Sequence, residues 1–543
     1  MTTRWIVGVL ALMVAGCGAD ENRGPAGDPD QFQLADNSGD TWTDSDPAPD
    51  ALVDTLNEDH RTDLTPGDDT TDSLPDDTDI SVPPDQLTPA GLSVEGPLEW
   101  QRAQVTIFFD CQLPETQEPA ELAVYYSPDG FSFVPATGAD NMNPGSSVLS
   151  GSHRFVWDSM ADVTEDLDNV QVQVQLKLKG GEILASMTKP FALMNRLDRD
   201  RTLLVSHYLG ETNTVRPLRF QHGVGLSTHG PLLTVGEKPV RILMDDAGKV
   251  AVVFNDGDPS LDFLAMSKTG EVVSLGNRSF GLSFSDGFYT PDGSGLYLLN
   301  YNSQPGAGVY RLDTHPHTRL PVDAAEPVLI FEHYVASRIA SLPGDLGYAT
   351  VSSTLDDPRG DLVFQLVSLD GELLGEHHFS PEGSLARGLA VTAHEGGMLA
   401  LVSYFNLFGE PAQVVLFHID ESFQISLAQA LGVSDPEDVL FTSDGWHAVV
   451  SEGEGNRVAG LKITPEPLGV QVIDRVVLGL ALTMGSCRYG PDADRFFVST
   501  IGASSGESGL GIVTLQDGML AKHPTHVLGT GFDVIPAGIA IQP

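Results

Sequence analysis

The chain contains the segment Asp246-Ala-Gly-Lys-Val-Ala-Val-Val-Phe-Asn255, in which turn-forming residues come directly before a short β-branched and aromatic run. Related segments follow at intervals of about 47 to 52 residues. They are Pro291-Asp-Gly-Ser-Gly-Leu-Tyr-Leu-Leu-Asn300, Pro343-Gly-Asp-Leu-Gly-Tyr-Ala-Thr-Val-Ser352, Ala393-His-Glu-Gly-Gly-Met-Leu-Ala-Leu-Val-Ser403, Ser443-Asp-Gly-Trp-His-Ala-Val-Val-Ser451 and Pro491-Asp-Ala-Asp-Arg-Phe-Phe-Val-Ser499. Each copy predicts one tight turn that leads into one buried strand. A repeat of this length is typical of an architecture with four strands per unit.

A second apolar segment precedes most copies, as Val240-Arg-Ile-Leu-Met244 precedes the first. The two segments and the turn between them predict a hairpin. Two further strand-like runs fit before the next copy, for example residues 308–312 and 327–331. Four antiparallel strands of this kind make one blade of a β-propeller.

The two ends of the repeat region predict how the ring closes. Residues 200–206 match the second strand of the repeat but have no hairpin partner before them. The chain stops at Pro536-Ala-Gly-Ile-Ala-Ile-Gln-Pro543, which matches that missing partner. We therefore expect an all-β fold in which residues 198–543 form a seven-bladed propeller, closed by three strands from one end and one from the other. Such closure leaves no open sheet edge.

Two segments carry a resemblance to a known family. Thr290-Pro-Asp-Gly-Ser-Gly-Leu-Tyr297 and the terminal Pro-x-Gly-Ile-Ala-x-x-Pro pattern resemble the seven-bladed YVTN/lactonase-like propeller superfamily. The resemblance covers about residues 198–543 and implies the architecture. For activity it implies only that a lactone-hydrolysing propeller is one alternative.

Composition limits the possible functions. The chain has 543 residues, too many for a single core, and a formal net charge of −46. This charge disfavours binding to phosphates, so we expect no nucleic-acid partner. Three cysteines cannot form a disulfide scaffold, and Cys111 and Cys487 are predicted to be buried as small apolar side chains.

The N-terminus predicts a lipid anchor. Arg4 precedes a short apolar run, and Val14-Ala-Gly-Cys17 follows it. The run is too short to span a bilayer and is typical of a signal peptide. Residues 14–17 resemble the lipobox of bacterial lipoproteins, which implies cleavage before Cys17 and lipidation of its thiol, with delivery to the outer membrane. The alternative is an ordinary secretory signal over residues 1–17.

Residues 18–90 predict a disordered acidic tether. The segment holds twenty acidic residues and two arginines, Arg23 and Arg61. It cannot bury enough apolar surface to offset its chain entropy, and its charges repel one another. Its Asp-rich repeats could be read as calcium ligands, but they lack the spacing of a calcium loop.

Residues 91–195 predict a two-sheet β-sandwich. Residues 170–178 and 104–109 alternate apolar and polar residues, so each run has one buried face. Residues 123–134 predict a hairpin around Pro128-Asp-Gly130, and Phe155 and Trp157 share one strand face. The pattern is similar to immunoglobulin-like or fibronectin type III-like modules, which implies a spacer or presenting role. The short charged join at residues 195–200 predicts that the sandwich lies close against the propeller.

Several short motifs match functional patterns without their structural context. Gly502-Ala-Ser-Ser-Gly506 fits the hydrolase pattern, but strand-like runs flank it on both sides where a helix is needed. The tripeptide at residues 359–361 spells an adhesion motif within a loop-like stretch. The pairs His377-His378 and His315-Pro-His317 lack the third ligand and the spacing of a zinc site. We expect no catalytic motif, no metal and no cofactor here.

Charged residues at the start of the innermost strands form the first candidate site. The alignment of these strands puts Asp286, Arg338, Arg387 and Glu437 at equivalent positions in four consecutive blades. Two arginines at a concave mouth could bind a carboxylate or phosphate. Alternatively, the four residues pair among themselves and close the channel.

Loops between the second and third strands form the second candidate site, on the same face. Their polar residues suit recognition of a protein or a sugar. The candidates are Asp256, Asp258, Tyr301, Asn302, Tyr404, Asn406, Glu452 and Asn456. Asp256, Asp258 and Asp262 could also hold a calcium ion weakly.

These features together predict a lipid-anchored protein of the bacterial cell envelope, in contact with the membrane through Cys17. Its propeller would be a non-catalytic platform for an envelope protein or a carbohydrate. The alternatives are a lactonase-like hydrolytic propeller, which needs a general base beside the arginines, and a purely structural envelope component.

Overall fold

The computed structural model describes residues 91–542 except 98–99, 140–141, 143, 197–198, 208–212, 222–223, 302–305, 334–335, 354–360, 382, 454–456, 479, 490–492, 502–506, 517 and 531–535. The described residues belong to one unit, Thr88–Pro543. The predictions for residues 1–90, including Cys17, lie outside them. Within them, no helix combines the length and the apolar character needed to cross a bilayer.

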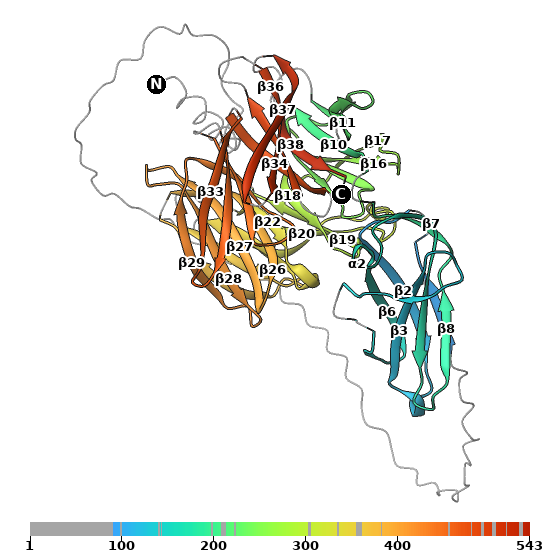
Figure 1. Cartoon of the computed structure of the whole chain (residues 1–543). Coiled ribbons are helices and arrows are strands. Elements are labelled where there is room, and N and C mark those ends of the chain that lie inside the picture. The colour runs from blue at the N-terminus through green and yellow to red at the C-terminus, as the bar shows by residue number, and fades with distance from the viewer. Residues whose placement is uncertain are drawn as a thin grey trace, which may run out of the picture. The chain divides into compact units, whose positions relative to one another are not determined.

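The first part of the described chain is a β-sandwich, as predicted (Figure 1). One sheet has the order β1-β2-β6, and the other has β4-β3-β7-β8, with β5 paired to β3 and β9 to β7. The strands are β1 (Gly91–Glu95), β2 (Gln104–Gln112), β3 (Ala120–Ser127), β4 (Val134–Pro135), β5 (Ser147–Val148), β6 (Gly151–Asp158), β7 (Asp166–Lys177), β8 (Ile183–Met187) and β9 (Phe191–Met194), with short helices η1 (Glu115–Gln117) and α2 (Ser159–Asp162).

The sandwich core contains the residues that the alternation indicates. Val170, Val172, Val174 and Leu176 of β7 are fully buried, and the intervening side chains are partly exposed. Trp157 is also buried, and its indole nitrogen donates a hydrogen bond to Asp162 at 2.6 Å. The predicted hairpin around Pro128-Asp-Gly130 joins β3 to β4. Cys111 is buried and free, as expected, whereas the side chain of Cys487 lies outside the described ones.

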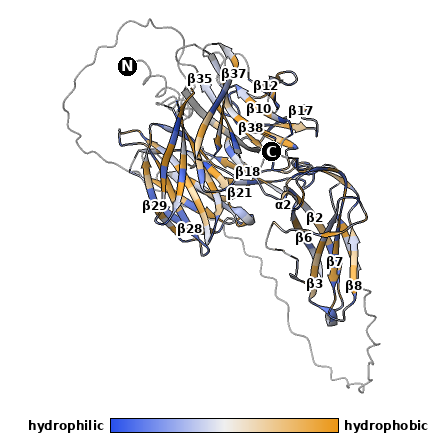
Figure 2. Cartoon of the chain, in the orientation of Figure 1, coloured by the Kyte–Doolittle hydropathy of each residue, from blue (hydrophilic) through white to orange (hydrophobic). Residues whose placement is uncertain are grey.

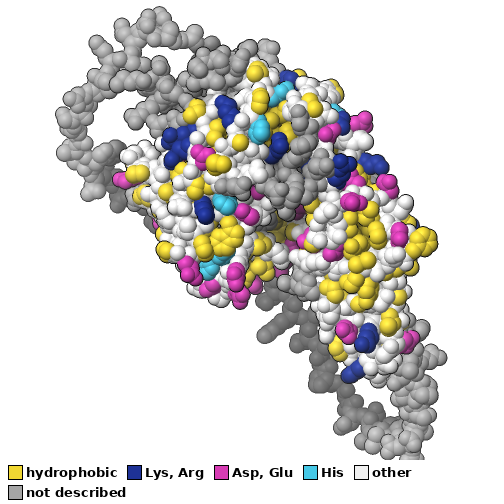
Figure 3. Space-filling model, in the orientation of Figure 1, with side chains coloured by type: hydrophobic (Ala, Val, Ile, Leu, Met, Phe, Trp, Pro, Cys, Tyr) yellow, Lys and Arg dark blue, Asp and Glu magenta, His cyan; other side chains and the backbone are white. Residues whose placement is uncertain are grey.

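The sandwich leaves some apolar side chains in solvent. Figure 3 shows hydrophobic side chains gathered on the face of the sandwich in view. The exposed ones include Phe131, Leu149, Ile183 and Met187. Two of these belong to β8, which is an edge strand of its sheet.

The second part forms seven antiparallel sheets among the described residues, one for each predicted blade. Their strand orders are β12-β11-β10-β38, β14-β15-β16-β17, β18-β19-β20-β21, β22-β23-β24-β25, β26-β27-β28-β29, β30-β31-β32-β33 and β34-β35-β36-β37.

The strand bounds of blades 1 to 4 are as follows: β10 (Arg201–His207), β11 (Thr214–Gln221), β12 (Gly225–Thr228), β13 (Leu233–Thr234), β14 (Pro239–Met244), β15 (Val250–Asn255), β16 (Ser260–Met266), β17 (Val272–Ser279), β18 (Phe284–Tyr289), β19 (Gly295–Asn300), β20 (Gly308–Asp313), β21 (Val328–Glu332), β22 (Ala336–Ser341), β23 (Tyr348–Ser353), β24 (Leu362–Val367) and β25 (Leu373–His378), with helix η2 (Pro343–Asp345).

Those of the remaining blades are β26 (Ser384–His394), β27 (Gly397–Asn406), β28 (Gln413–Asp420), β29 (Ile425–Gly432), β30 (Pro436–Phe441), β31 (His447–Glu452), β32 (Arg457–Pro465), β33 (Leu468–Val477), β34 (Leu480–Tyr489), β35 (Ala493–Ile501), β36 (Glu507–Gln516), β37 (Met519–Thr530) and β38 (Pro536–Ile541). Each predicted run coincides with a strand of the same blade.

The ring closes as the two chain ends predict. Strand β38 pairs antiparallel with β10, so that Leu203 lies opposite Ile541 and Val205 opposite Ile539. The backbone N–H of Gly538 also donates to the Ser206 hydroxyl at 2.8 Å. Three strands from the start of the propeller and one from its end therefore complete the first blade.

The repeated segment is apolar on both faces because each blade packs between two others. In β15 all six residues are buried. Val252 and Phe254 face the third blade, and Ala251 and Val253 face the first. Since strand side chains alternate in direction, a strand buried on both faces shows a continuous apolar run. Figure 2 shows hydrophobic residues along the strands of the blades.

Seven apolar clusters among the described residues fill the spaces between neighbouring blades. One of them joins Phe497 and Leu510 of the last blade to Leu203 and Ile539 of the first. The hydrophobic core is therefore itself a closed ring.

In three blades an aspartate, Asp245, Asp292 or Asp444, builds the turn before the buried strand. The Asp245 carboxylate accepts hydrogen bonds from the backbone N–H groups of Ala247 at 3.1 Å and Val250 at 2.7 Å. Gly248 has a φ of 70°, which glycine adopts without steric cost. Asp444 binds the N–H of Trp446 at 2.8 Å in the same way. This bonding explains why Asp is followed closely by Gly in these turns, as in Asp245-x-x-Gly248 and Asp444-Gly445.

The sandwich contacts the propeller through the turns between first and second strands. Arg154 of β6 bonds to Asp292 and lies 2.8 Å from Asp345. The Lys249 ammonium lies 5.7 Å from the ring centre of Trp100. These contacts agree with the predicted close join.

Candidate functional site

The candidate site lies at one end of the central channel, where the innermost strand of each blade begins and the second strand ends. Each of five innermost strands has an irregularity at this point, where one extra residue interrupts the pairing. Such bulges re-aim side chains and are common beside functional sites. The charged residues gathered here are Arg241, Asp286, Arg338, Arg387, Glu437 and Asp438.

The predicted equivalence of four of these residues is wrong by one position. Asp286 and Arg338 come directly after the extra residue, whereas Arg387 and Glu437 are themselves the extra residues. The residues that match Arg338 are Gly388 and Asp438. Sequence alignment does not show the bulge, so the two halves of the set appear to be in register.

Glycine at position 388 has a packing reason. A Cβ there would lie 2.8 Å from the backbone nitrogen of Val439 in the next blade. The close approach leaves no room for a side chain. The positive charge of this blade is therefore carried by the bulged residue Arg387.

Asp286 pairs with an arginine that the sequence did not single out. The Arg241 Nε lies 2.5 Å from the Asp286 Oδ1, and the same oxygen accepts the N–H of Gly287 at 2.9 Å. Asp286 is fully buried. Arg241 holds the same place in its strand as Asp286 and Arg338 hold in theirs, and this placement is the signal that could have revealed it.

Arg387 and Glu437 form the second ion pair, as the pairing alternative predicts. Their Nη1 and Oε2 atoms are 2.9 Å apart, and both side chains are largely buried. The guanidinium also lies 4.4 Å from the ring centre of Phe405, a favourable cation–π distance. Burial raises the pKa of Glu437, and the charge of Arg387 opposes this rise.

Arg338 stands between these pairs and has only backbone acceptors. Its Nη1 donates to the carbonyl oxygen of Ser337 at 2.7 Å, and its Nε donates to that of Arg387. It forms no ion pair with a carboxylate of the described residues. Burial lowers the pKa of Arg338, and the positive charge of Arg241 lowers it further.

Asp438 is held by the backbone. Its two oxygens accept the N–H groups of Val439 at 3.0 Å and Met484 at 3.1 Å. Burial raises its pKa, and Arg241 and Arg338 oppose the rise. Its position links the sixth blade to the seventh, which is a structural task.

Three of the six described loop candidates are buried, which corrects their assignment to a binding surface. Tyr404, Asn406 and Glu452 are each less than a tenth exposed, and so is Asn255, which comes directly before the candidate Asp256. Asn255 bonds to Asp262 at 2.8 Å, and Glu452 lies 3.3 Å from Arg475. These side chains lie at the ends of the second strands. Their bonds hold the loops in place, and they do not form the loop surface. The partly exposed candidates are Asp256, Asp258 and Tyr301; Asn302 and Asn456 lie outside the described residues.

The calcium hypothesis for the first of these loops is not supported by the bonding. The Asp256 carboxylate accepts the Tyr301 hydroxyl at 2.6 Å, and Asp258 accepts the N–H of Glu237 at 3.0 Å. Asp262 accepts the N–H of Gly236 at 2.8 Å. Where the chain is described, no group of three or more potential ligands could hold a metal ion.

Most residues of the short motifs lie outside the part of the chain that the structure describes. Residues 502–506 and residues 359–360 lie outside it. The hydrolase pattern is followed by strand β36 and not by a helix, so the fold lacks the strand–turn–helix context on which that motif depends.

Comparison with known proteins supports the fold. Neither a protein-family model nor a curated protein matches the chain. The hypothetical selenium-binding protein from Sulfolobus tokodaii is 9% identical, with a TM-score of 0.52 over 63% of this chain and 93% of that chain. At this identity the likeness shows the fold alone.

Two other solved structures are similar to the chain. The periplasmic gluconolactonase of Pseudomonas aeruginosa is 15% identical, with a TM-score of 0.49, and covers 63% of this chain and 99% of its own. A functionally unknown protein from Desulfotomaculum acetoxidans is 16% identical, with a TM-score of 0.43, and covers 63% and 99%. The sheet topology and the likeness to the Sulfolobus tokodaii protein together define a seven-bladed β-propeller fold.

Proposed function

We propose that the chain is a lipid-anchored protein of the bacterial cell envelope whose propeller binds a protein or carbohydrate partner without catalysing a reaction. The observation that carries the binding role is Arg338. Its guanidinium is half-buried at the channel end and has only carbonyl oxygens as partners among the described residues. An arginine in a confined mouth that donates hydrogen bonds only to carbonyl oxygens suits a carboxylate, such as that of a sugar acid or an acidic side chain.

The acids around Arg338 support binding rather than catalysis. Asp286 is paired with Arg241, Glu437 with Arg387, and Asp438 accepts two backbone N–H groups. A general base needs a lone pair directed at the proton that it removes. Each of these carboxylates already has at least one oxygen bonded within the protein.

Lactone hydrolysis is the second candidate, and one observation favours it. Burial raises the pKa of Glu437, which is a common property of acid–base residues. Catalysis through Glu437 would require it to leave Arg387. A purely structural envelope role is the third candidate, and it predicts that no small acid binds.

We expect Arg338→Gln to abolish binding of sugar acids and leave folding intact. The substitution removes the guanidinium that would bind a carboxylate through two hydrogen bonds, so glucuronate or galacturonate should bind at least about tenfold more weakly. It breaks no ion pair of a described carboxylate, so folding should be unaffected. Isothermal titration measures the binding, and thermal melting of the unliganded chain should change little. Lys462→Gln, an exposed change on β32, is the matched control.

Two results would contradict this proposal. Wild-type protein that binds no carboxylate in the panel would favour the structural role. Turnover of a sugar lactone that is lost in Glu437→Gln would favour the hydrolase.

The anchor has its own test in the variant Cys17→Ser. Because acylation of this thiol is the expected attachment, the variant should lose lipid labelling and leave the membrane fraction almost completely. Metabolic labelling with a fatty acid and fractionation after a salt wash measure both effects. A processed variant that stays in the membrane would show that the lipoprotein assignment is wrong.

A further inference from the structure

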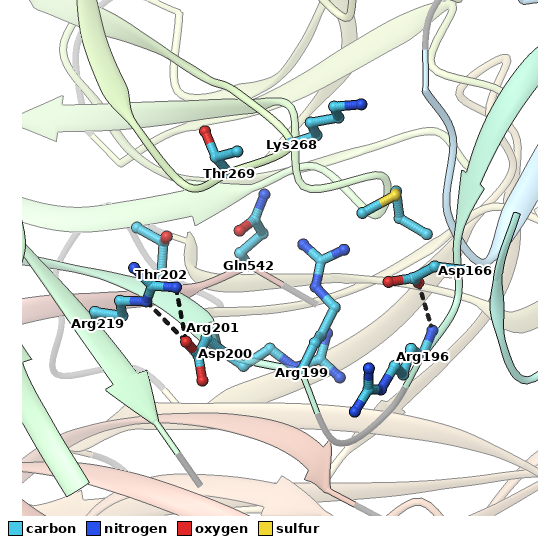
Figure 4. Close-up of a pocket in the computed structure, with 11 residues that line it drawn as sticks. Asp166, Arg196, Arg199, Asp200, Arg201, Thr202, Arg219, Lys268, Thr269 and Gln542 are labelled. Atoms are coloured by element: carbon cyan, nitrogen blue, oxygen red, sulfur yellow. Dashed lines mark hydrogen bonds and ion pairs between the residues drawn. The ribbon is translucent and has the colours of Figure 1, made fainter. Parts of the chain in front are cut away.

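A pocket of 510 Å³ lies where the sandwich joins the propeller (Figure 4). Five of its lining residues are cationic: Arg196, Arg199, Arg201, Arg219 and Lys268. Two are acidic, Asp166 and Asp200, so positive charges exceed negative ones by three. This excess occurs in a chain with a net charge of −46. Among the described lining residues, Met194 is the only apolar side chain besides the threonine methyl groups, so this lining does not suit an apolar ligand.

The two acids are already engaged on opposite sides of the pocket (Figure 4). Asp200 lies 2.7 Å from the Arg219 Nη2 and also accepts the side-chain amide of Gln221 at 3.0 Å. Asp166 accepts the backbone N–H of Arg196 at 3.0 Å. Asp200 therefore pairs with one lining cation, and Asp166 holds the backbone at Arg196.

Arg199 lies between these two groups in Figure 4. Its Nη1 is buried and has no hydrogen-bond acceptor among the described residues. Burial lowers the pKa of Arg199, and the nearby charge of Asp166 opposes the change. A buried donor without an acceptor destabilises the unliganded fold, and a ligand oxygen beside it would relieve that cost.

The propeller wall of the pocket is preformed. Gln542 donates its side-chain amide to the carbonyl oxygen of Gly248 at 3.2 Å, and the Thr202 hydroxyl donates to that of Gly270 at 3.2 Å. Gly270 has a φ of +84°, and a Cβ at this position would lie 2.1 Å from the Thr202 oxygen. A rigid wall lowers the entropy cost of binding. Gln542 comes directly after β38, so this wall lies at the opposite end of that strand from the channel site.

We propose that this junction pocket binds a small polyanion that carries phosphate or carboxylate groups. Arginines offer planar pairs of donors that match both groups, and several cationic side chains line one cavity, which suits a ligand with more than one anionic group. The volume falls within the usual range for small-molecule sites. The site is separate from the channel end, so its occupancy does not depend on Arg338.

Isothermal titration of the full chain with pyrophosphate and with citrate tests the proposal, at an ionic strength held constant with sodium chloride. These probes distinguish a phosphate from a carboxylate ligand. We expect one molecule of the preferred probe per chain. Arg199→Gln should weaken binding at least about tenfold, and Lys268→Gln, an exposed change, about threefold. Lys462→Gln should bind like the wild type. Thermal melts report whether each variant is folded.

The outcomes separate this pocket from the channel end. Binding that is lost in Arg199→Gln but kept in Arg338→Gln supports the pocket, whatever the channel end binds. Binding that is lost in Arg338→Gln and kept in Arg199→Gln and Lys268→Gln overturns it. A wild-type chain that binds neither probe also overturns it.

Discussion

Deletion of residues 537–543 is expected to leave the propeller insoluble or to lower its melting temperature by well over ten degrees. The deletion removes nearly all of β38, the innermost strand of the first blade, and exposes the pairing edge of β10. Ile539 and Ile541 belong to the cluster between the last blade and the first, and Ala540 to the next cluster. Loss of two buried isoleucines costs about 5 kcal/mol, comparable with the whole stability of many domains.

Thermal melting and the soluble fraction after expression measure this effect. The conservative change Ile541→Val is the control, since it removes one methyl group and should cost only about 1 kcal/mol. If the truncated chain melts within a few degrees of the full one, β38 does not close the ring. A large loss in the truncation beside a small one in Ile541→Val would show that the strand, and not one side chain, holds the two ends together.

The fold could be predicted because its signals are local and repeated. The Asp245 and Asp444 turns show in the sequence as Asp followed closely by Gly, and each is followed by a strand buried on both faces. The period between copies indicates four strands per blade, and the incomplete units at the two ends of the repeat region indicate how the ring closes. Both predictions rest on pattern alone, and the sheets confirm them.

The candidate site was predicted less well, because its geometry depends on a single extra residue in each innermost strand. The bulge puts Arg387 and Glu437 one place away from Asp286 and Arg338. The error did not prevent the prediction of the Arg387–Glu437 pair. Both residues are the extra residue of their strands, and the two strands belong to neighbouring blades, so the side chains still meet. It did conceal Arg241, whose neighbours in sequence are apolar.

The loop residues and the junction pocket show two other limits of sequence. Asn255 and Glu452 are polar, yet both are fully buried, where the Asn255 amide nitrogen donates to Asp262 and Glu452 pairs with Arg475. Polarity alone therefore does not locate a surface. Arg219, Lys268 and Gln542 meet in one pocket although no short motif contains them. Only the closure of the ring brings the end of the chain beside the start of the propeller.

Arg387→Gln is expected to destabilise the propeller by about 3 kcal/mol, in contrast to the small effect expected of Arg338→Gln. The reason is what each change leaves behind. Removal of Arg387 leaves Glu437 largely buried without its cation, whereas no carboxylate among the described residues depends on Arg338 in this way. Melting in denaturant at pH 7 compares both variants with the wild type. Equal losses in the two variants would contradict the separate roles of the two arginines.

The pH dependence of Arg387→Gln identifies the cause of its loss. Burial already raises the pKa of Glu437, and removal of the opposing arginine should raise it further. A carboxyl whose pKa is higher in the folded than in the unfolded chain binds protons on folding, so its contribution to stability falls as pH rises through that range. Arg387→Gln should therefore regain stability between pH 7 and pH 5 relative to the wild type. The double variant Arg387→Gln/Glu437→Gln should regain most of it at pH 7, since no buried charge is left unpaired. A deficit that stays constant with pH would assign the loss to the contact between Arg387 and Phe405 instead.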